Sequence, residues 1–446
     1  MNDTIVAIAT AHGVASISIL RISGEEALAI AHKVSKLQEI IPRHAHLTSI
    51  YTYDNTLIDR AIMIHFKAPF SFTGEEIVEF QCHGGMIVAQ EVLDTILAHG
   101  ARLAGAGEFS KRAFLNGKMD LTEAEAVSKL IEAKSVDAVK ILAKQMKGEL
   151  KVFVNESREA LLRSLAYSEV MIDYAEEDIP DDIMQSIVTQ LDSLTEKITQ
   201  IVEASHRRRG LIEGFKVAII GKPNVGKSSL LNALLSYDRA IVSDIAGTTR
   251  DTIEEQVRIG SHIIRLVDTA GIRNSEDIIE KIGIERSLSS VEEADIIIAL
   301  FDSATISNEE DEKIFTLLES LEDKEIIIGL NKSDLPRLFE HKKLSHFDIL
   351  EVSATRSFFK LTTKLENIFD KIGEGDELML ISARQIEAVT SAKEAILEAK
   401  IPLLDGELEF FSYHLQEAVK AISSISKPYD NEEILDKMFG EFCLGK

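Results

Sequence analysis

Short apolar runs, each followed by glycine or a polar residue, recur through the middle of the chain between residues 213 and 372. The runs are four to six residues long and rich in β-branched side chains, which is typical of strands buried in a parallel sheet. They occupy residues 215–220, 263–267, 326–330 and 349–352. A run of helix formers at residues 229–235 follows the first of them. The pattern predicts an α/β domain whose ligands lie at the carboxyl ends of the strands.

The residues before 117 alternate between the strand and helix periodicities. Strands are predicted at residues 5–10, 17–22, 61–66 and 77–81, and helices at residues 25–36 and 87–98. This alternation predicts a compact α+β domain.

Helical spacing of apolar residues dominates on both sides of the central domain. A capping box at Thr122 and Glu125 is predicted to open a long helix. Further helices are expected at about residues 150–172, 183–204, 378–398 and 407–425. We therefore expect one helical bundle built from residues 118–212 and 373–446. The domain at residues 213–372 would be inserted between its halves, which is feasible when a domain's ends lie close together.

Two charged segments interrupt the helical pattern. The acidic run at residues 173–182 predicts a solvated loop. The basic cluster from His206 to Gly210 has two interpretations, a contact to RNA phosphates or a helix C-terminus that ends at the glycine. We favour the helix C-terminus.

Composition limits the partners and the compartment. The formal charge of −25 argues against a broad basic surface, so any RNA contact must use a local patch. The sequence shows no secretory leader and no apolar run of about 18 residues, so neither secretion nor a membrane span is expected. The two cysteines, Cys82 and Cys443, predict free thiols in a reducing cytoplasm rather than a disulfide framework or a metal site.

A phosphate-binding loop is predicted at residues 221–228, which fit the pattern G-x-x-x-x-G-K-[ST] between a strand and a helix. In that setting successive backbone N–H groups hold phosphate oxygens. Lys227 is expected to reach the terminal phosphates, and the Ser228 hydroxyl group is expected to hold Mg²⁺.

Three further motifs identify the nucleotide as GTP. Asp268-Thr269-Ala270-Gly271 follows a strand, where Asp268 would act on Mg²⁺ through water and the Gly271 N–H would sense the γ-phosphate. Asn331-Lys332-Ser333-Asp334 resembles the guanine-reading motif of GTPases, whose aspartate accepts two hydrogen bonds that adenine cannot supply. Ser353-Ala354-Thr355 resembles the loop whose backbone N–H meets the guanine oxygen. The central domain is therefore predicted to be a GTPase domain.

The N-terminal domain has one glycine-rich turn, at residues 83–85, preceded by the acidic segment at residues 72–79. From spacing alone this is a tight turn with solvated carboxylates. His83 has no partner at metal-ligand spacing, so metal binding is not favoured.

Several segments, in order along the whole chain, resemble the MnmE (TrmE) family of tRNA-modification GTPases. They are residues 19–24, 72–75, 83–85, 114–121 and the Cys-x-Gly-Lys tail at 442–446, together with the inserted GTPase domain. The resemblance implies an N-terminal α+β folate-binding domain, a helical bundle domain and an inserted Ras-like P-loop GTPase domain.

In this family the N-terminal domain, residues 1–117 here, forms a constitutive homodimer. It binds 5,10-methylenetetrahydrofolate or 5-formyltetrahydrofolate. By motif position the resemblance assigns Arg21, Glu79, Lys118 and Lys446 to the folate site. Cys443 matches a tail cysteine that is a possible nucleophile.

The resemblance also implies the residues of the GTP site. Residues 243–251 match the family's switch segment, in which Thr249 binds Mg²⁺. The Asn224 side chain would bind K⁺ together with the backbone carbonyls of Ser243, Ile245 and Thr248. The residues expected to contact GTP are Asn224, Val225, Gly226, Lys227, Ser228, Ser229, Ser243, Asp244, Ile245, Ala246, Gly247, Thr248, Thr249, Asp268, Thr269, Ala270, Gly271, Asn331, Lys332, Asp334, Ser353 and Ala354.

Hydrolysis needs a residue that orients water, and Ile272 stands where Ras-like proteins have a catalytic glutamine. The family's answer maps to Glu280, which positions water when two GTPase domains meet. K⁺ then stabilises the charge that an arginine finger stabilises in other GTPases.

These features predict a GTP- and K⁺-dependent enzyme that, with an FAD-dependent partner resembling MnmG, acts on tRNA. It would add an aminomethyl or carboxymethylaminomethyl group at C5 of the wobble uridine, with folate supplying the one-carbon unit. Two alternatives stay open. A ribosome-assembly GTPase that binds rRNA is disfavoured by the acidic chain and the lack of an appended RNA-binding module. A folate-dependent one-carbon enzyme with a merely regulatory GTPase is kept open by Cys443.

Overall fold

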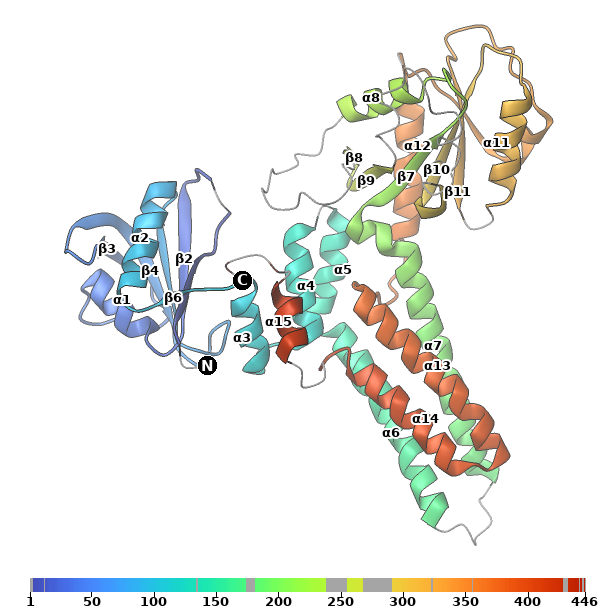
Figure 1. Cartoon of the computed structure of the whole chain (residues 1–446). Helices are drawn as coiled ribbons and strands as arrows, with labels where there is room; N and C mark the ends of the chain where they lie inside the picture. The colour runs from blue at the N-terminus through green and yellow to red at the C-terminus, as the bar shows by residue number, and fades with distance from the viewer. Residues whose placement is uncertain are drawn as a thin grey trace. The chain divides into compact units, whose positions relative to one another are not determined.

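The computed structural model of the protein (Figure 1) describes residues 3–11, 13–133, 135–173, 181–237, 255–267, 291–321, 324–354, 356–427, 432–440, 442 and 445. The chain divides into two compact units. The first comprises residues 1–131, 144–195 and 387–446, and the second comprises residues 132–143 and 196–386. Each unit is therefore built from segments that are far apart in the sequence.

The N-terminal part of the first unit is a six-stranded sheet with the order β3-β4-β5-β2-β1-β6. The strands are β1 (Ile5–Ile8), β2 (Ile17–Ser23), β3 (His46–Tyr51), β4 (Leu57–Phe66), β5 (Ile77–His83) and β6 (Arg102–Leu103). All neighbours are antiparallel except β1 and β6. Helices α1 (Ala27–Ser35) and α2 (Met86–Ala98) complete the predicted elements, which are confirmed. Sequence patterns did not predict β3, which has few apolar residues, or the two-residue β6.

Alternate side chains of β2 and β5 are buried. Leu20, Val78 and Phe80 are fully buried and pack in one core with residues of α1 and α2. Because successive side chains of a strand point to opposite faces, Arg21 and Glu79 lie on the other face of this sheet.

Besides α1 and α2, the first unit contains α3 (Glu108–Leu115), α4 (Leu121–Glu132), α6 (Glu149–Asp173), α14 (Leu408–Ser423) and α15 (Glu432–Gly440). Helices α5 (Val136–Met146), α7 (Asp181–Glu213) and α13 (Ala383–Asp405) contribute to both units. Helices α6 and α14 pack side by side (Figure 1), and Ser168 and Ser412 share a buried hydrogen bond of 2.7 Å between them. The helical patterns on either side of the central domain are thus confirmed as packed helices.

The capping box lies two residues before the predicted one. The N–H of Glu123 donates to Asp120 Oδ1 at 2.9 Å, and the N–H of Asp120 donates to Glu123 Oε2 at 2.7 Å. Asp120 therefore caps α4. The predicted box at Thr122 and Glu125 was wrong because the Thr122 hydroxyl group donates to the Asp120 carboxylate, at 2.7 Å.

The single long helix predicted after this box is also wrong. The chain forms α4 and then α5 (Val136–Met146) as separate helices. The Ser135 hydroxyl oxygen accepts the N–H of Ala138 at 3.0 Å and donates to the carbonyl oxygen of Leu211 at 2.8 Å. Ser135 therefore caps α5 and ties its start to α7.

The second unit contains a six-stranded sheet with the order β12-β11-β10-β7-β9-β8. Its strands are β7 (Phe215–Ile220), β8 (Glu255–Ile259), β9 (His262–Val267), β10 (Ile296–Asp302), β11 (Glu325–Asn331) and β12 (Asp348–Glu351). Five strands run parallel, and β8 is antiparallel to β9. The helices that follow strands are α8 (Lys227–Tyr237), α11 (Glu309–Glu319) and α12 (Phe359–Gly373), with a 3₁₀ turn at Lys342–His346. The four predicted strands and the helix after the first are confirmed; β8 and β10 were not predicted.

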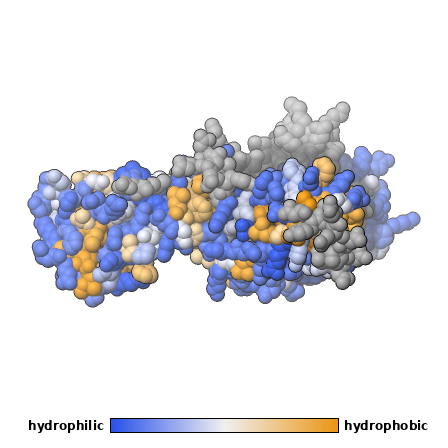
Figure 2. Space-filling view, turned by 90° about the horizontal axis from the view of Figure 1, so that it is seen from below, coloured by the Kyte–Doolittle hydropathy of each residue, from blue (hydrophilic) through white to orange (hydrophobic). Residues whose placement is uncertain are grey.

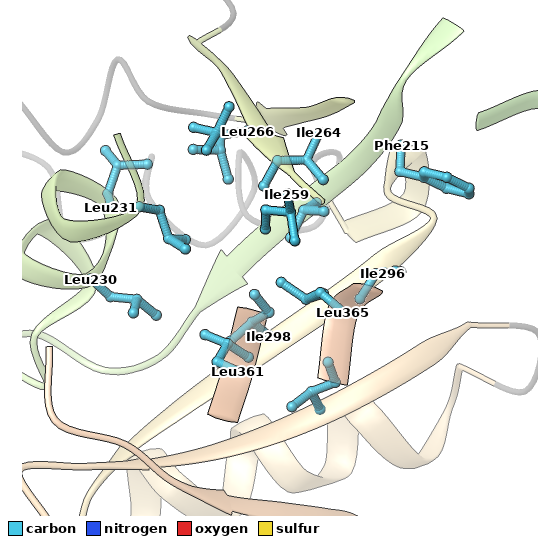
Figure 3. Packing of buried hydrophobic residues seen from close by; sticks show 14 of the residues in the cluster. Phe215, Leu230, Leu231, Ile259, Ile264, Leu266, Ile296, Ile298, Leu361 and Leu365 are labelled. Carbon is cyan, nitrogen blue, oxygen red and sulfur yellow. The ribbon is translucent and has the colours of Figure 1, made fainter. Parts of the chain in front are cut away.

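Apolar residues fill the space between this sheet and its helices. Figure 3 shows Leu230 and Leu231 of α8 and Leu361 and Leu365 of α12 directed toward the sheet, where Ile298 is fully buried. This core fixes the positions of the strand ends, and the positions of the loops that follow the strands depend on them.

The basic cluster does not end its helix at Gly210, so the favoured interpretation was wrong, whereas the contact to RNA phosphates stays a prediction. Helix α7 continues through Gly210 to Glu213, and Gly214, with φ +89°, follows its end. Arg208 is buried and donates to the carbonyl oxygens of Gly373 at 3.2 Å and Gly375 at 2.9 Å. It therefore joins the chain segments that enter and leave the inserted sheet.

Candidate functional site

The phosphate loop lies between β7 and α8, at the carboxyl end of a central parallel strand. Lys227 Nζ donates to the carbonyl oxygens of Gly221 at 2.7 Å and Lys222 at 2.9 Å. Burial lowers the pKa of Lys227. Asn224 has φ +64° and Gly226 has φ +98°, so the backbone curls in the left-handed region on both sides of the buried Val225. Successive N–H groups of such a curl form a concave anion site.

The guanine-reading motif lies beside this loop. Asn331 ends β11, and its Nδ2 donates to the carbonyl oxygen of Val225 at 2.7 Å. Its Oδ1 accepts the N–H of Ala354 at 3.1 Å. One amide group thus joins the phosphate loop to the loop after β12. Gly226 is required here, because a Cβ would lie 2.2 Å from Asn331 Nδ2.

The carboxylate of Asp334 is held in place by a second cross-link. The Ser353 hydroxyl group donates to Asp334 Oδ1 at 2.9 Å, and this hydrogen bond lowers the pKa of Asp334. Lys332, with φ +61°, turns its side chain toward Asp302. The structure therefore brings together three of the four predicted nucleotide loops. Ser228 and Ser229 lie in the first turn of α8.

The rest of the predicted site lies outside the described residues. This applies to the switch segment from Ser243 to Thr249, the Asp268–Gly271 motif and Glu280. The expected Mg²⁺ and K⁺ ligands are thus described only at Ser228 and Asn224.

The predicted folate residues Arg21 and Glu79 face each other across β2 and β5, where they are directly paired. Arg21 Nε donates to Glu79 Oε1 at 2.9 Å, and both side chains are mostly buried. The guanidinium group lies 5.5 Å from the ring centre of Phe72 and 5.8 Å from that of Phe109. A cation lined by aromatic rings is a suitable surface for a flat anionic ligand.

The tail of the chain reaches the same sheet. Gly445, with φ +93°, is buried, and a Cβ there would lie 2.6 Å from the carbonyl oxygen of Ile8. Ile8 pairs with Leu20, the neighbour of Arg21. Lys446 and Cys443 lie outside the described residues. Lys118 Nζ donates to the carbonyl oxygen of Pro69 at 2.8 Å.

Sequence patterns missed a buried arginine behind this surface. Arg112 of α3 is fully buried and donates to the carboxylates of Asp3 at 2.8 Å, Glu108 at 3.0 Å and Glu75 at 3.2 Å. Glu108 lies four residues earlier in the same helix, but Asp3 and Glu75 come from distant segments, so local spacing could not reveal the network. The network fixes the segment around Phe72 and Phe109.

Three predictions from individual residues can be compared with the structure. Cys82 is buried, and burial raises its pKa to about 12, so this thiol is unreactive. His83 pairs with Asp59 at 2.7 Å, and the described residues contain no cluster able to hold a metal ion. Within the same residues, no helix has the length and apolar character that a membrane span requires.

The fold and its loops define the class of the second unit. A mostly parallel sheet with a phosphate loop after β7 and guanine-type motifs after β11 and β12 is the architecture of a Ras-like P-loop GTPase domain.

Comparisons with known proteins give the family. Residues 121–443 match the model of the MnmE helical domain, and residues 4–118 match the GTP-binding protein TrmE N-terminus. The chain is 78% identical to the tRNA modification GTPase MnmE of Sulfurovum sp. over 100% of this chain and 99% of that protein. It is 58% identical to MnmE of Aliarcobacter butzleri, with 100% and 99% covered. The chain belongs to the MnmE family of tRNA modification GTPases.

Among solved structures, Era in complex with MgGDPNP and a segment of 16S ribosomal RNA is similar to part of the chain. The identity is 30% and the TM-score 0.28, over 41% of this chain and 66% of Era.

Proposed function

We propose that this GTPase requires Mg²⁺ and K⁺ and acts as a homodimer with an FAD-dependent partner resembling MnmG. The complex modifies C5 of the tRNA wobble uridine with a one-carbon unit from tetrahydrofolate. The observation that carries the proposal is the presence of two prepared sites in one chain, the joined nucleotide loops and the aromatic-lined Arg21–Glu79 pair.

In the nucleotide site, the N–H groups of residues 224–229 and the Lys227 ammonium group hold the phosphates, and the Ser228 hydroxyl group and Thr249 hold Mg²⁺. Asp334 accepts two hydrogen bonds from guanine, and the aliphatic part of Lys332 covers the base. The short distances from Asn331 to Val225 and to Ala354 support this assignment, because they set the base loops against the phosphate loop. The switch residues 243–249 and 268–271 complete the site.

Hydrolysis depends on K⁺ and on Glu280 in this proposal. Asn224 is exposed and has the left-handed conformation, with φ +64°. The carbonyl oxygens of Ser243, Ile245 and Thr248 complete the cation site, and the cation stabilises negative charge that develops between the phosphates. Glu280 orients the attacking water when two GTPase domains meet.

The N-terminal sheet provides the homodimer contact and the folate site. Its open face carries exposed apolar side chains, among them Ile17 at 54%, Leu47 at 60% and Ile62 at 39% exposure. Figure 2 shows apolar residues gathered on the part of the surface formed by this domain. Such a patch supports an interface with a second copy. Arg21, Glu79, Lys118 and Lys446 would bind folate at this face.

The test is GTP turnover at fixed ionic strength in K⁺ and in Na⁺, for the wild type and Glu280→Ala. We expect turnover in K⁺ to exceed that in Na⁺ by about ten-fold or more, because the cation acts in place of an arginine finger. Glu280→Ala should lose most of the K⁺-dependent rate while still binding GTP. Equal rates in the two salts would remove Asn224 from a cation site and contradict the proposed mechanism.

A further inference from the structure

A segment without a GTPase motif connects the two nucleotide loops. It runs from Asp302, at the end of β10, to Asp311, in the first turn of α11. We propose that residues 302–311 form a brace that positions the phosphate loop through Lys222 and the guanine loop through Lys332. The proposal rests on the nucleotide site described above.

The first contact of the brace is the ion pair of Lys222 and Asp311. Lys222 Nζ lies 2.7 Å from Asp311 Oδ2, with side-chain exposures of 12% and 0%. The carbonyl oxygen of Lys222 accepts a hydrogen bond from Lys227 Nζ at 2.9 Å. The residue anchored to α11 by its side chain therefore holds the phosphate-binding lysine by its backbone. A displacement of Lys222 would displace the ammonium group that meets the phosphates.

Asp311, the residue of α11 that holds Lys222, is itself fixed in place. Asp311 forms a capping box with Asn308, through hydrogen bonds of 3.0 and 3.2 Å, and both belong to the brace. Phe315 of the same helix is fully buried and stacks on Phe301 of β10, with ring centres 4.6 Å apart. The Asp311 carboxylate is buried, so removal of the lysine that neutralises it would leave an uncompensated charge in the protein interior.

The second contact of the brace is the ion pair of Asp302 and Lys332. Lys332 Nζ lies 2.6 Å from Asp302 Oδ2, which belongs to a buried carboxylate. The N–H of Ser303 donates to the carbonyl oxygen of Asn331 at 2.9 Å. The brace thus fixes both the side chain and the backbone of the guanine loop. These contacts add a second connection to the direct one between Asn331 and Val225.

The two lysines therefore act as positioning residues rather than as isolated surface charges. Their carboxylate partners lie nine residues apart on one segment, at residues 302 and 311. That segment is flanked by Phe301 and Phe315, which are both in the core. An ordered phosphate loop costs less entropy when it binds nucleotide, so loss of either contact should weaken binding.

The first experiment measures the Kd of GDP by calorimetry for full-length wild type, Lys222→Met and Lys222→Arg. We expect Lys222→Met to raise the Kd by about ten-fold, because a charge-assisted anchor is lost. The arginine variant, which keeps the ion pair, should stay within about two-fold of wild type. Lys216→Met is the matched control, because Lys216 lies in the preceding strand and pairs with Glu293 at 3.1 Å, away from the loops. The control should leave the Kd unchanged.

A double-mutant cycle separates positioning from simple destabilisation. If Lys222 acts through Asp311, then Lys222→Met combined with Asp311→Asn should raise the Kd no more than the larger single effect. The unfolding temperature without nucleotide identifies any variant that fails to fold. Additive effects on the Kd, or a Lys222→Met Kd within about two-fold of wild type, would overturn the first contact. If only the Lys222→Met result fails, wild type still binds GDP and the proposed nucleotide site is retained. If wild type itself fails to bind GDP, both the brace and the proposed nucleotide site are overturned.

The second contact has its own variant. Asp302→Asn should raise the Kd of GDP by about five-fold, because Lys332 loses the partner that holds it beside the base. Asp348→Asn is the control, since Asp348 pairs with Lys364 at the edge strand β12. An unchanged Kd for Asp302→Asn would reduce the brace to its phosphate-loop contact and overturn the proposal that it joins both loops.

Discussion

Asp334 is the residue whose chemistry is most directly tied to the choice of nucleotide. Its Oδ1 accepts a hydrogen bond from the Ser353 hydroxyl group, and that bond lowers the pKa of the carboxyl group. An ionised carboxylate can only accept hydrogen bonds, which suits the two donors on one edge of guanine. If Asp334 reads the base as proposed, Ser353 acts on the base through Asp334.

Asp334→Asn is expected to exchange the specificity of the site. GTP binding should fall by about a thousand-fold, because the amide presents donors to the donors of guanine. Xanthosine triphosphate, which has a carbonyl group in place of the exocyclic amine, should bind better to the variant than GTP does. The measurement is competition of both nucleotides against labelled GDP and labelled XDP. A variant that still prefers GTP would show that Asp334 does not read the base.

Glu108 makes a pH-dependent contribution to the stability of the N-terminal domain. Burial alone raises its pKa, but hydrogen bonds from Arg102, the Gly105 N–H and Arg112 outweigh burial and lower it to about 2. Because the folded pKa lies below the ordinary value of 4.5, the stabilisation is present above about pH 4.5 and is lost as the pH falls toward 2. Glu108→Gln should therefore destabilise this domain at pH 7 by about 2 kcal/mol, after allowance for partial exposure.

The effect of Glu108→Gln should fall to less than about half of its pH 7 value at pH 3, because the folded carboxyl group is protonated only near pH 2. Labelling of Cys82 by 4,4′-dithiodipyridine along a urea gradient reports the opening of this domain, because the thiol is buried in its core. A Cys443→Ser background leaves Cys82 as the only thiol. A difference between the variant and wild type that is as large at pH 3 as at pH 7 would contradict the ion-pair network.

At the scale of elements, the start of α4 depends on one carboxylate. Asp120 accepts the N–H of Glu123 and the hydroxyl group of Thr122. Asp120→Ala should lower the free energy of unfolding by about 1–2 kcal/mol through loss of the cap. Urea unfolding followed by circular dichroism measures the change. Glu149→Ala is the control, since Glu149 is an exposed acidic residue in the first turn of α6 in the same unit and should change stability by about 0.5 kcal/mol or less.

The elements that the sequence predicts correctly are those set by neighbouring residues. The strand, loop and helix around Lys227 form from one continuous segment, and the GTPase motifs at Asn331 and Ser353 each follow a strand of their own. The break at Ser135 escaped prediction because its hydroxyl group bonds to Leu211, which lies 76 residues later. Arg208 was misread for the same reason, since Gly373 is 165 residues away.

The nucleotide site shows the same division between local and distant information. The residues proposed to contact phosphate or base stand in recognisable motifs, so the sequence alone could predict them. Lys222 and Asp302 escaped notice because their roles depend on partners in other elements, and β10, which carries Asp302, was not predicted. A motif therefore predicts the contact residues, whereas the supporting contacts require the fold.

At the scale of the whole molecule, charge bears on how the protein meets tRNA. The chain has 74 acidic and 49 basic residues. Its densest basic cluster, at residues 206–210, has few positive side chains available to bind phosphate. Arg208 is buried and donates to backbone carbonyl groups, and Arg209 pairs with Glu213 at 2.8 Å. His206 and Arg207 remain exposed. We infer that the chain alone makes few phosphate contacts and that the proposed FAD-dependent partner supplies most of the RNA-binding surface.

This inference predicts a weak salt dependence of tRNA binding by the chain alone. Raising KCl from about 50 to about 200 mM should reduce the affinity by about three- to ten-fold, as expected for one or two phosphate contacts. Fluorescence anisotropy of a labelled unmodified tRNA at constant Mg²⁺ measures it. Arg207→Gln should flatten the dependence, whereas Arg258→Gln, at an exposed arginine on β8, should not. A fall of about a thousand-fold would require five or more phosphate contacts. The chain would then possess a basic surface of its own, and the partner would not be needed to hold the RNA.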